Sequence, residues 1–397
     1  MKRFLSLLLA AVLAAMCLTG CSFGKKSEST KAGLYYRASG IGPDEVLLTV
    51  DGWDVTADRY FYWLTSTCDY ISSYYEKAGK TVDWSENHNG QSLAQYAQQQ
   101  ALSNTALYAE IESWAKKYGC EVTQDDLNGI STEWDTKAQE YGGEEPYLAK
   151  LAYMGIDKAT AQLISADFYL YNHLYEKFCD KDSELYPNQA DLDSYAKENS
   201  FLTVDDILIS TADVTAGDTA ALAKKKQQAQ VLLSTISASS SPLTTFADLA
   251  DQYSQESSRS DYPDGFTFAP GTGVMPDAFE KAALALKENG ISGVVETDKG
   301  YYIILRKQLD MDTVGSNYFD HELQTAAQNA KIDYSDSYQK IDVADFYEKL
   351  TEARSKLENP APVADSSASG GDTSAQTALP GAVGDAGGLP SAASSAG

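Results

Sequence analysis

The stretch Val204-Asp-Asp-Ile-Leu-Ile209, together with the later run Gly300-Tyr-Tyr-Ile-Ile-Leu-Arg306, decides the fold of this 397-residue chain. Both runs are short and apolar and are rich in β-branched or aromatic residues, which is typical of strands. Between them the sequence predicts three helices, near residues 220–236, 246–253 and 277–287. A Ser/Gly/Pro loop precedes the third helix, and Asn289-Gly290 follows it as a turn. This order, βααα-β-β, allows the first and last strands to pair at the centre of a sheet.

The order and spacing of these pieces resemble a parvulin-type peptidyl-prolyl isomerase domain, over roughly a quarter of the chain. The runs that carry the resemblance are Asp206-Ile-Leu-Ile209, Phe246-Ala-Asp-Leu-Ala-Asp-Gln-Tyr-Ser-Gln-Glu-Ser-Ser258, Gly273-Val-Met-Pro-Asp-Ala-Phe279, Leu286-Lys-Glu-Asn-Gly-Ile-Ser-Gly-Val-Val295 and Gly300-Tyr-Tyr-Ile-Ile-Leu305. Together with the N-terminal signals described below, they make the whole chain similar to the PrsA and SurA group of extracytoplasmic foldases.

The resemblance implies an α+β fold, in which a mainly helical chaperone-like domain carries an inserted parvulin-type domain with an antiparallel sheet wrapped by helices. The expected segments are a signal peptide (1–20), a tether (21–44), a helical N-domain (45–200), the parvulin-like domain (201–309), a C-terminal segment (310–358) and a Ser/Ala/Gly/Pro tail (359–397). The segment 310–358 is too short to bury a core alone, so it is expected to pack on the N-domain. The tail has too little apolar surface to offset its ordering entropy and is expected to be disordered.

The N-terminus has the features of a targeting signal. Lys2 and Arg3 precede an apolar run, 4–18, that is too short to span a bilayer. The following Leu18-Thr-Gly-Cys21 resembles a bacterial lipobox, so Cys21 is expected to carry a diacylglycerol after cleavage. Two acyl chains suit stable anchoring. The expected location is the extracytoplasmic face of a bacterial cell membrane, and the alternative is an ordinary secretory peptide with an incidental cysteine.

Charge and cysteine usage exclude several classes of function. The chain has 31 Lys and Arg against 57 Asp and Glu, a net charge of -26, which argues against nucleic-acid binding. Besides Cys21, the mature chain keeps Cys68, Cys120 and Cys179 without any CxxC spacing. This pattern argues against a disulfide framework or a zinc site and favours buried free thiols. No cofactor is expected, because no P-loop or metal-ligand spacing occurs.

Local signals predict further elements outside the parvulin-like stretch. Thr56 is expected to cap a helix, and Thr123 with Asp126 resembles a capping box. Residues 332–341 are expected to form a strand. All five Trp lie between Trp53 and Trp134, so the helical region is rich in aromatic residues, which serve as core or expose a surface to unfolded clients.

The resemblance also implies a site. Phe268, Met275 and Phe279 stand at the positions that hold the proline ring in the family, although packing in an ordinary core is a rival interpretation. Met275 and Phe279 are expected one helical turn apart. Asp206 and Tyr302 stand where the family has a His pair, and Glu256 stands where it has Asp or Cys. The chain's histidines, His88, His173 and His321, all lie elsewhere. We expect Asp206 and Tyr302 to share a hydrogen bond.

Two functions from different classes follow. The first is a lipid-anchored foldase that isomerises X-Pro bonds in unfolded or newly secreted polypeptides, with Asp206, Glu256 and Tyr302 as its polar catalytic groups. The second is a holdase that binds such chains without catalysis. An adhesin or solute-binding lipoprotein is a weaker third option, and the absence of repeated α/β units argues against a solute-binding protein.

Overall fold

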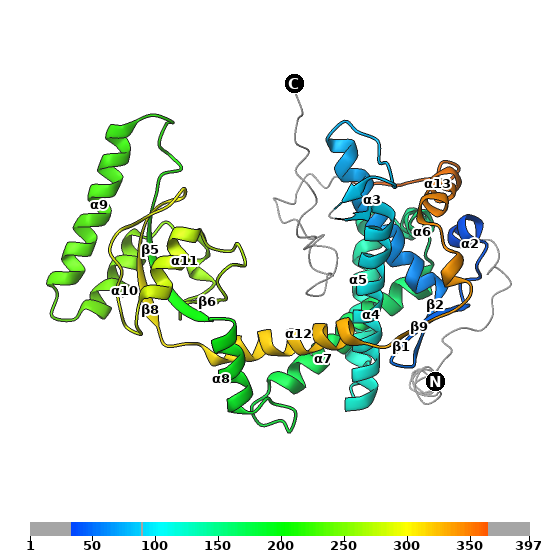
Figure 1. Ribbon diagram of the computed structural model, residues 1–397, viewed down its shortest axis with the longest axis horizontal. Helices are drawn as coiled ribbons and strands as arrows, with labels where there is room; N and C mark the ends of the chain where they lie inside the picture. Colours follow the sequence, from blue (N-terminus) through cyan, green and yellow to red (C-terminus); the bar gives the residue numbers. More distant parts are fainter. Residues whose placement is uncertain (1–32, 89, 364–397) are drawn as a thin grey trace. The chain divides into compact units, whose positions relative to one another are not determined.

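The computed structural model describes residues 33–88 and 90–363, which form two compact units (Figure 1). The first unit comprises residues up to Lys177 and from Asp320 onward, and the second spans Phe178–Phe319. The predicted α+β class, helix-rich with small antiparallel sheets, is confirmed. The predicted signal peptide, Cys21 and the tail beyond residue 363 lie outside the described residues.

The first unit is mainly helical. Its elements are α2 (Leu34–Ser39), β1 (Val46–Val50), β2 (Trp53–Thr56), α3 (Ala57–Lys77), β3 (Asn87–His88), β4 (Gln91–Ser92), α4 (Leu93–Tyr118), α5 (Gln124–Glu140), α6 (Glu144–Met154), most of α7 (Lys158–Cys179), the second half of α12 (Met311–Asn329), β9 (Ile332–Tyr334) and α13 (Val343–Arg354). Strand β1 lies between β2 and β9 in an antiparallel sheet. Residues from the two ends of the chain therefore share one sheet.

Side-chain caps explain where several of these helices begin. The Thr123 hydroxyl accepts from the Asp126 backbone N–H, and the Asp126 carboxylate accepts from the Thr123 N–H, so the predicted capping box is confirmed. Ser92 and Gln95 form a second such box at the start of α4. Thr56 occupies the cap position of α3, but its hydroxyl donates to the Asp58 carboxylate at 2.6 Å and makes no backbone cap. That prediction was wrong, because Asp58 competes for the hydroxyl.

Two further expectations from the sequence are corrected. Residues 34–39 of the predicted tether form helix α2, which buries Leu34, Tyr35 and Ala38 against α13. The sequence analysis did not predict this short helix, because the glycines that flank it are typical of a tether. The predicted strand 332–341 ends at Tyr334, and a 3-10 turn follows at Tyr338–Lys340. The turn lets Tyr338 pack edge-on against Tyr60 in the core, which a continuous strand would not place there.

The second unit is built on a four-stranded sheet in the order β6-β5-β8-β7. The central strands β5 (Leu202–Ser210) and β8 (Gly300–Lys307) pair antiparallel, with residues 203–210 opposite residues 300–307, so the predicted pairing of these two strands is confirmed. The flanking strands are much shorter, β6 at Phe266–Phe268 and β7 at Val295–Glu296. Because β6 pairs only with residues 202–204, the rest of that edge of β5 is left for other partners.

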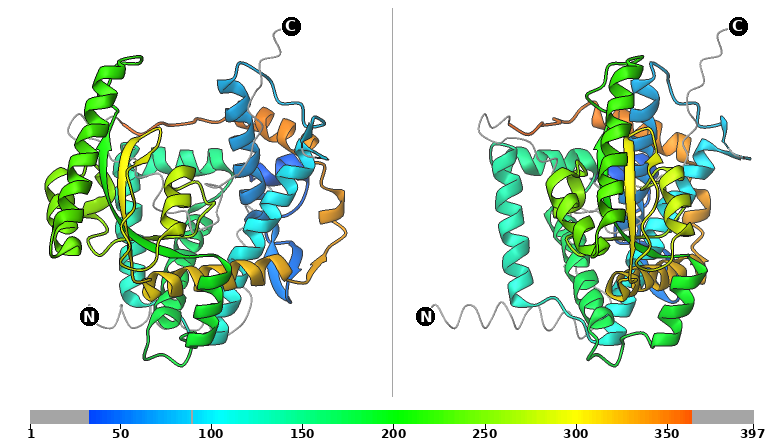
Figure 2. Two further views of the ribbon diagram at one scale, coloured as in Figure 1. Left: turned by 60° about the vertical axis from the view of Figure 1, so that its left-hand side comes forward. Right: turned by 90° about the vertical axis from the view of Figure 1, so that its left-hand side faces the viewer.

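Strand alternation divides the core of this unit into two layers. Helices α9 (Thr219–Ala238) and α10 (Pro242–Tyr253) cover one face of the sheet, and α11 (Asp277–Ala285) covers the other (Figures 1 and 2). Ile207, Ile209, Tyr301 and Ile303 point to the first face, whereas Leu208, Tyr302 and Ile304 point to the second. Helix α8 (Gln189–Glu198) and the start of α12 pack together beside Phe201, so this unit is wider than residues 201–309.

Gly300 is required where β8 begins. Its φ is +142°, and a Cβ there would lie 2.3 Å from the carbonyl oxygen of Ile209 on β5. Only glycine allows the two central strands to approach this closely at that end. This contact lies two residues from Tyr302 and helps to fix the register in which Tyr302 is opposite Leu208.

No helix in the described part of the chain is long and apolar enough to cross a membrane.

Candidate functional site

The loop after α10 is attached to the free edge of β5. The Ser254 hydroxyl accepts from the Leu208 backbone N–H at 3.1 Å, and the Gln255 N–H donates to the Leu208 carbonyl at 2.9 Å. The Gln255 side-chain oxygen accepts from the Ser210 N–H at 2.9 Å. These bonds replace the strand partner that β6 does not supply. They bring Glu256, the next residue, within hydrogen-bond distance of the Tyr302 hydroxyl on β8.

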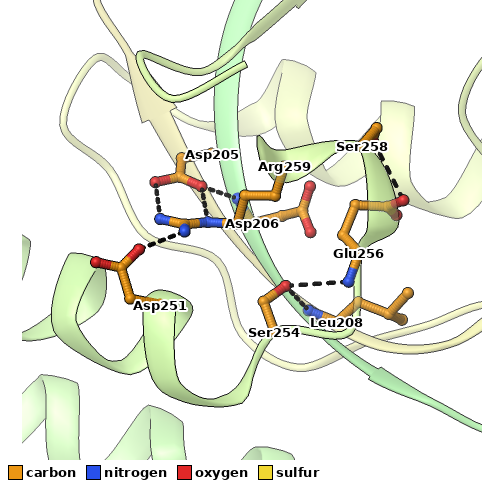
Figure 3. A network of polar contacts seen from close by, with 8 residues as sticks. All are labelled: Asp205, Asp206, Leu208, Asp251, Ser254, Glu256, Ser258 and Arg259. Atoms are coloured by element: carbon orange, nitrogen blue, oxygen red, sulfur yellow. Dashed lines mark hydrogen bonds and ion pairs between the residues drawn. The ribbon is translucent and has the colours of Figure 1, made fainter. Parts of the chain in front are cut away.

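Two adjacent aspartates on β5 point to opposite faces because of strand alternation. Asp205 accepts from Arg259, with 3.1 Å between its Oδ1 and the Arg259 Nε, and the same guanidinium also contacts Asp251 (Figure 3). Asp206 faces the α11 side, where Tyr302 lies. Figure 3 shows the guanidinium turned towards Asp205 and Asp251, with no bond drawn to Asp206. Arg259, whose charge acts on Asp206 through space, is thus already paired with two carboxylates.

Tyr302 joins the polar and apolar parts of the site. Its hydroxyl donates to Glu256 Oε2 at 3.1 Å, and its ring lies edge-on to Phe279 with 5.0 Å between centroids. The predicted hydrogen bond between Asp206 and Tyr302 is therefore wrong. The register pairs Tyr302 with Leu208 and Asp206 with Ile304, so the two side chains are diagonal neighbours on one face. The single phenol proton goes to Glu256 instead.

Asp206 is an unsatisfied buried carboxyl. It is 7% exposed, and in the described part of the chain no donor reaches its Oδ1. Burial, the charge of Glu256 and the charge of Asp205 raise the pKa of Asp206 to about 7, while Arg259 and Lys299 act in the opposite direction. Burial and the charges of Glu256 and Asp206 raise the pKa of Tyr302. Near neutral pH, Asp206 can therefore hold or release a proton, while Tyr302 remains a donor.

The three predicted ring-binding residues meet in one apolar cluster. Phe268, Phe279 and Tyr302 are buried within it, and Met275 and Phe266 pack against it while partly exposed. The Phe268 and Phe279 centroids are 6.4 Å apart. Met275 is not on α11, however, because the helix begins at Asp277 and Pro276 disfavours helical geometry at the residue before it. The expected one-turn spacing was wrong, although the two side chains still join the same cluster.

Several supporting residues escaped sequence reasoning. Glu280 on α11 is buried, and its Oε2 accepts from the Gly271 N–H at 2.9 Å, which fixes the loop before Met275. The Ser292 hydroxyl accepts from the Ile304 N–H at 2.8 Å and fixes the segment beside β8. The exposed Tyr262 lies edge-on to Phe266, which stacks on Phe268. No sequence motif predicts these contacts, because each one depends on the path of a loop.

Residues 192–307 match the family model of the PPIC-type PPIase domain. The second unit of this chain contains a PPIC-type domain. The chain is 38% identical over 104 residues to the foldase protein PrsA 2 of Listeria monocytogenes. This alignment covers 23% of this chain and 35% of the relative. It is 48% identical over 63 residues to the putative peptidyl-prolyl cis-trans isomerase dodo of Drosophila melanogaster, covering 16% of this chain and 37% of that protein.

These matches have a limited extent. The aligned region spans only about a third of the length of these curated relatives. Among solved structures, the foldase protein PrsA of Streptococcus pneumoniae aligns over 69% of this chain and 94% of its own, at 18% identity and a TM-score of 0.26. The sequence matches therefore concern the PPIC-type domain.

In the described residues, no cluster of His, Cys, Asp or Glu could hold a metal ion.

Proposed function

We propose that this chain is an extracytoplasmic foldase whose PPIC-type domain isomerises X-Pro bonds in unfolded or newly secreted polypeptides. The observation that carries the proposal is the assembly of Tyr302, which touches the Phe279 ring on one side and Glu256 on the other. An apolar wall beside polar groups is what this reaction requires. The family match of residues 192–307 supports the same conclusion.

The chemistry needs no bond to break. Rotation about the X-Pro bond crosses a barrier of roughly 20 kcal/mol because the amide loses its resonance. Met275 and Phe266, the partly exposed members of the cluster, hold the proline ring against Phe268 and Phe279. The twisted amide nitrogen regains a lone pair, which can accept a hydrogen bond from protonated Asp206. Interactions made only with the twisted amide accelerate the rotation.

Replacing Met275 with alanine is expected to lower kcat/KM by about tenfold, since a partly buried apolar side chain contributes on the order of 1.5 kcal/mol of contact. The rate is measured on a proline peptide with the full chain. Val231→Ala on α9 is the matched control, because Val231 is an exposed side chain on the opposite face of the sheet. Equal rates for the parent and the Met275 variant would contradict the ring-binding role.

A non-catalytic holdase is the second candidate, and one observation favours it. Phe279 is fully buried and Phe268 nearly so, so the ring-binding cluster is packed rather than open in this conformation. A holdase would suppress aggregation of an unfolded client without accelerating proline isomerisation. The same peptide assay separates the two, since a holdase leaves the rate at the uncatalysed background.

The proposal includes a lipid anchor at Cys21 on the extracytoplasmic face of the membrane. The Leu18-Thr-Gly-Cys21 run supports it. Cys21→Ala is expected to move the protein from the membrane fraction to the soluble one, without changing its thermal unfolding, because two acyl chains are lost. Cell fractionation followed by immunoblotting measures this. An unchanged membrane fraction would show that another segment holds the protein there.

A further inference from the structure

The carboxyl groups of the site lack a cation. Asp206 and Glu256 lie within electrostatic reach of each other, and neither forms an ion pair within residues 33–88 and 90–363. Arg259 contacts Asp205 and Asp251 instead (Figure 3). Lys299, on the exposed turn before β8, influences Asp206 only through space. Most buried side-chain polar atoms in folded proteins have a hydrogen-bond partner, so the unpartnered Oδ1 of Asp206 requires an explanation.

Asp206 lies on the same face of the sheet as the ring-binding cluster and is diagonal to Tyr302, a member of that cluster. Tyr302 connects this cluster to the carboxyl groups, because its ring packs on Phe279 and its hydroxyl donates to Glu256. Consecutive Cα atoms of a peptide are 3.8 Å apart, so a residue next to a bound proline can extend a long side chain towards these carboxyl groups. A lysine or arginine there would bring a positive charge to Glu256, whose oxygens accept from the Tyr302 and Ser258 hydroxyls but form no ion pair within residues 33–88 and 90–363.

Resting on the proposed function, we infer that the site selects proline segments in which lysine or arginine is adjacent to the proline. The cationic group pairs with the partly exposed carboxylate of Glu256, and protonated Asp206 remains the donor to the twisted amide. A glutamate at the same place is repelled by Glu256 and by the ionised fraction of Asp206, so the selection works by attraction and by exclusion. The substrate class is thus the basic X-Pro segment, and acidic segments are discriminated against.

Peptides test this preference in the full chain. One series carries Lys, Gln or Glu before the proline, and a second series carries them after it. Exchange spectroscopy by NMR gives the isomerisation rate without a coupling protease, whose own charge preference would interfere. Titration of the same peptides gives their Kd. We expect kcat/KM and affinity to fall in the order Lys, Gln, Glu in at least one series, with each step about fivefold at low salt and smaller at high salt.

Substitutions of the two carboxyl groups test whether they cause the charge preference. Glu256→Gln and Asp206→Asn are each expected to reduce the Lys-to-Glu ratio about fivefold, while Glu198→Gln, on the exposed surface of α8, leaves the ratio unchanged. Two variants keep the test decisive if one of them fails to fold.

The readouts separate this inference from the proposed function. Lys-selective binding without any rate enhancement would overturn the isomerase and support the charge preference. Equal rates and equal affinities across both series would overturn the preference while leaving the isomerase intact. A ratio that survives both carboxylate substitutions would also overturn it.

Discussion

Arg59→Met is expected to lower the free energy of unfolding of the first unit by about 3–5 kcal/mol, because it leaves buried carboxylates without their cation. Arg59 lies on α3 and joins two other helices. Its Nη1 is 3.0 Å from Glu112 Oε1 on α4, and its Nη2 is 2.5 Å from Asp167 Oδ2 on α7. The Asp167 side chain is only 3% exposed. Water therefore cannot replace the guanidinium.

The electrostatics of this cluster support a large effect. Burial opposes the charge on Arg59, but the carboxylates of Asp167 and Glu112 outweigh it and raise the pKa of Arg59. Burial raises the pKa of Asp167, and Arg59 counteracts that increase. Without Arg59, ionised Asp167 loses its main stabilising partner. The loss is expected to be larger at pH 8 than at pH 5, since a protonated Asp167 needs no cation.

Tryptophan fluorescence in urea measures this change selectively, because all five Trp lie between residues 53 and 134 of the first unit. Lys349→Met on α13 is the control, since its pair with Asp345 is exposed and should contribute below about 1 kcal/mol. Combining Arg59→Met with Asp167→Leu should restore much of the loss. If the double variant is as unstable as the sum of the two single ones, the ion pair is not the cause.

The elements of the second unit were predictable because their signals are local. The apolar run at 204–209 and the aromatic run at 300–306 form β5 and β8, and the predicted helices match α9, α10 and α11 closely. Strand period, helix period and turn residues act within a few positions, so a sequence records them directly. Glu256, Asp206 and Tyr302 were also expected in one site, and the structure brings them together.

The bonds inside the site were not predictable, since they depend on register and loop paths. A register with Tyr302 opposite Leu208 makes Asp206 a diagonal neighbour, and nothing in either strand alone specifies it. The Glu256 position depends on Ser254 and Gln255 attaching to an edge of β5 that exists only because β6 is short. Arg59 with Asp167 is a similar case, because two residues 108 positions apart carry no mutual signal in a single sequence.

Asp206→Asn is expected to stabilise the second unit by about 2–4 kcal/mol at pH 8, while changing little near pH 4. The pKa of Asp206 is raised from 3.8 to about 7 by burial first, and then by the charges of Glu256 and Asp205. A carboxyl whose pKa is raised on folding binds more protons in the folded state than in the unfolded state. Its stabilising contribution is complete below 3.8 and is lost as the pH rises through 7.

The size of the effect follows from the same shift. Each pKa unit corresponds to about 1.4 kcal/mol, so the shift of Asp206 sets an upper bound of about 4 kcal/mol on the stability lost between the two pKa values. An asparagine cannot ionise, so this slope should vanish in the variant. Glu256→Gln should flatten the slope in part, because it removes the second largest cause of the raised pKa. Arg259 and Lys299 limit the shift in the parent and remain in both variants.

Urea unfolding of the full chain at a series of pH values measures the slope, with hydrogen exchange of peptides from β5 and β8 reporting the second unit alone. Glu198→Gln is the control, because it makes the same charge change at an exposed position on α8 and should leave the slope as it is in the parent. A parent whose second unit is equally stable at pH 5 and pH 8 would contradict the argument. Asp206 would then be ionised throughout and could not donate a hydrogen bond to the twisted amide, so the isomerase mechanism proposed for this site would lose its proton donor as well.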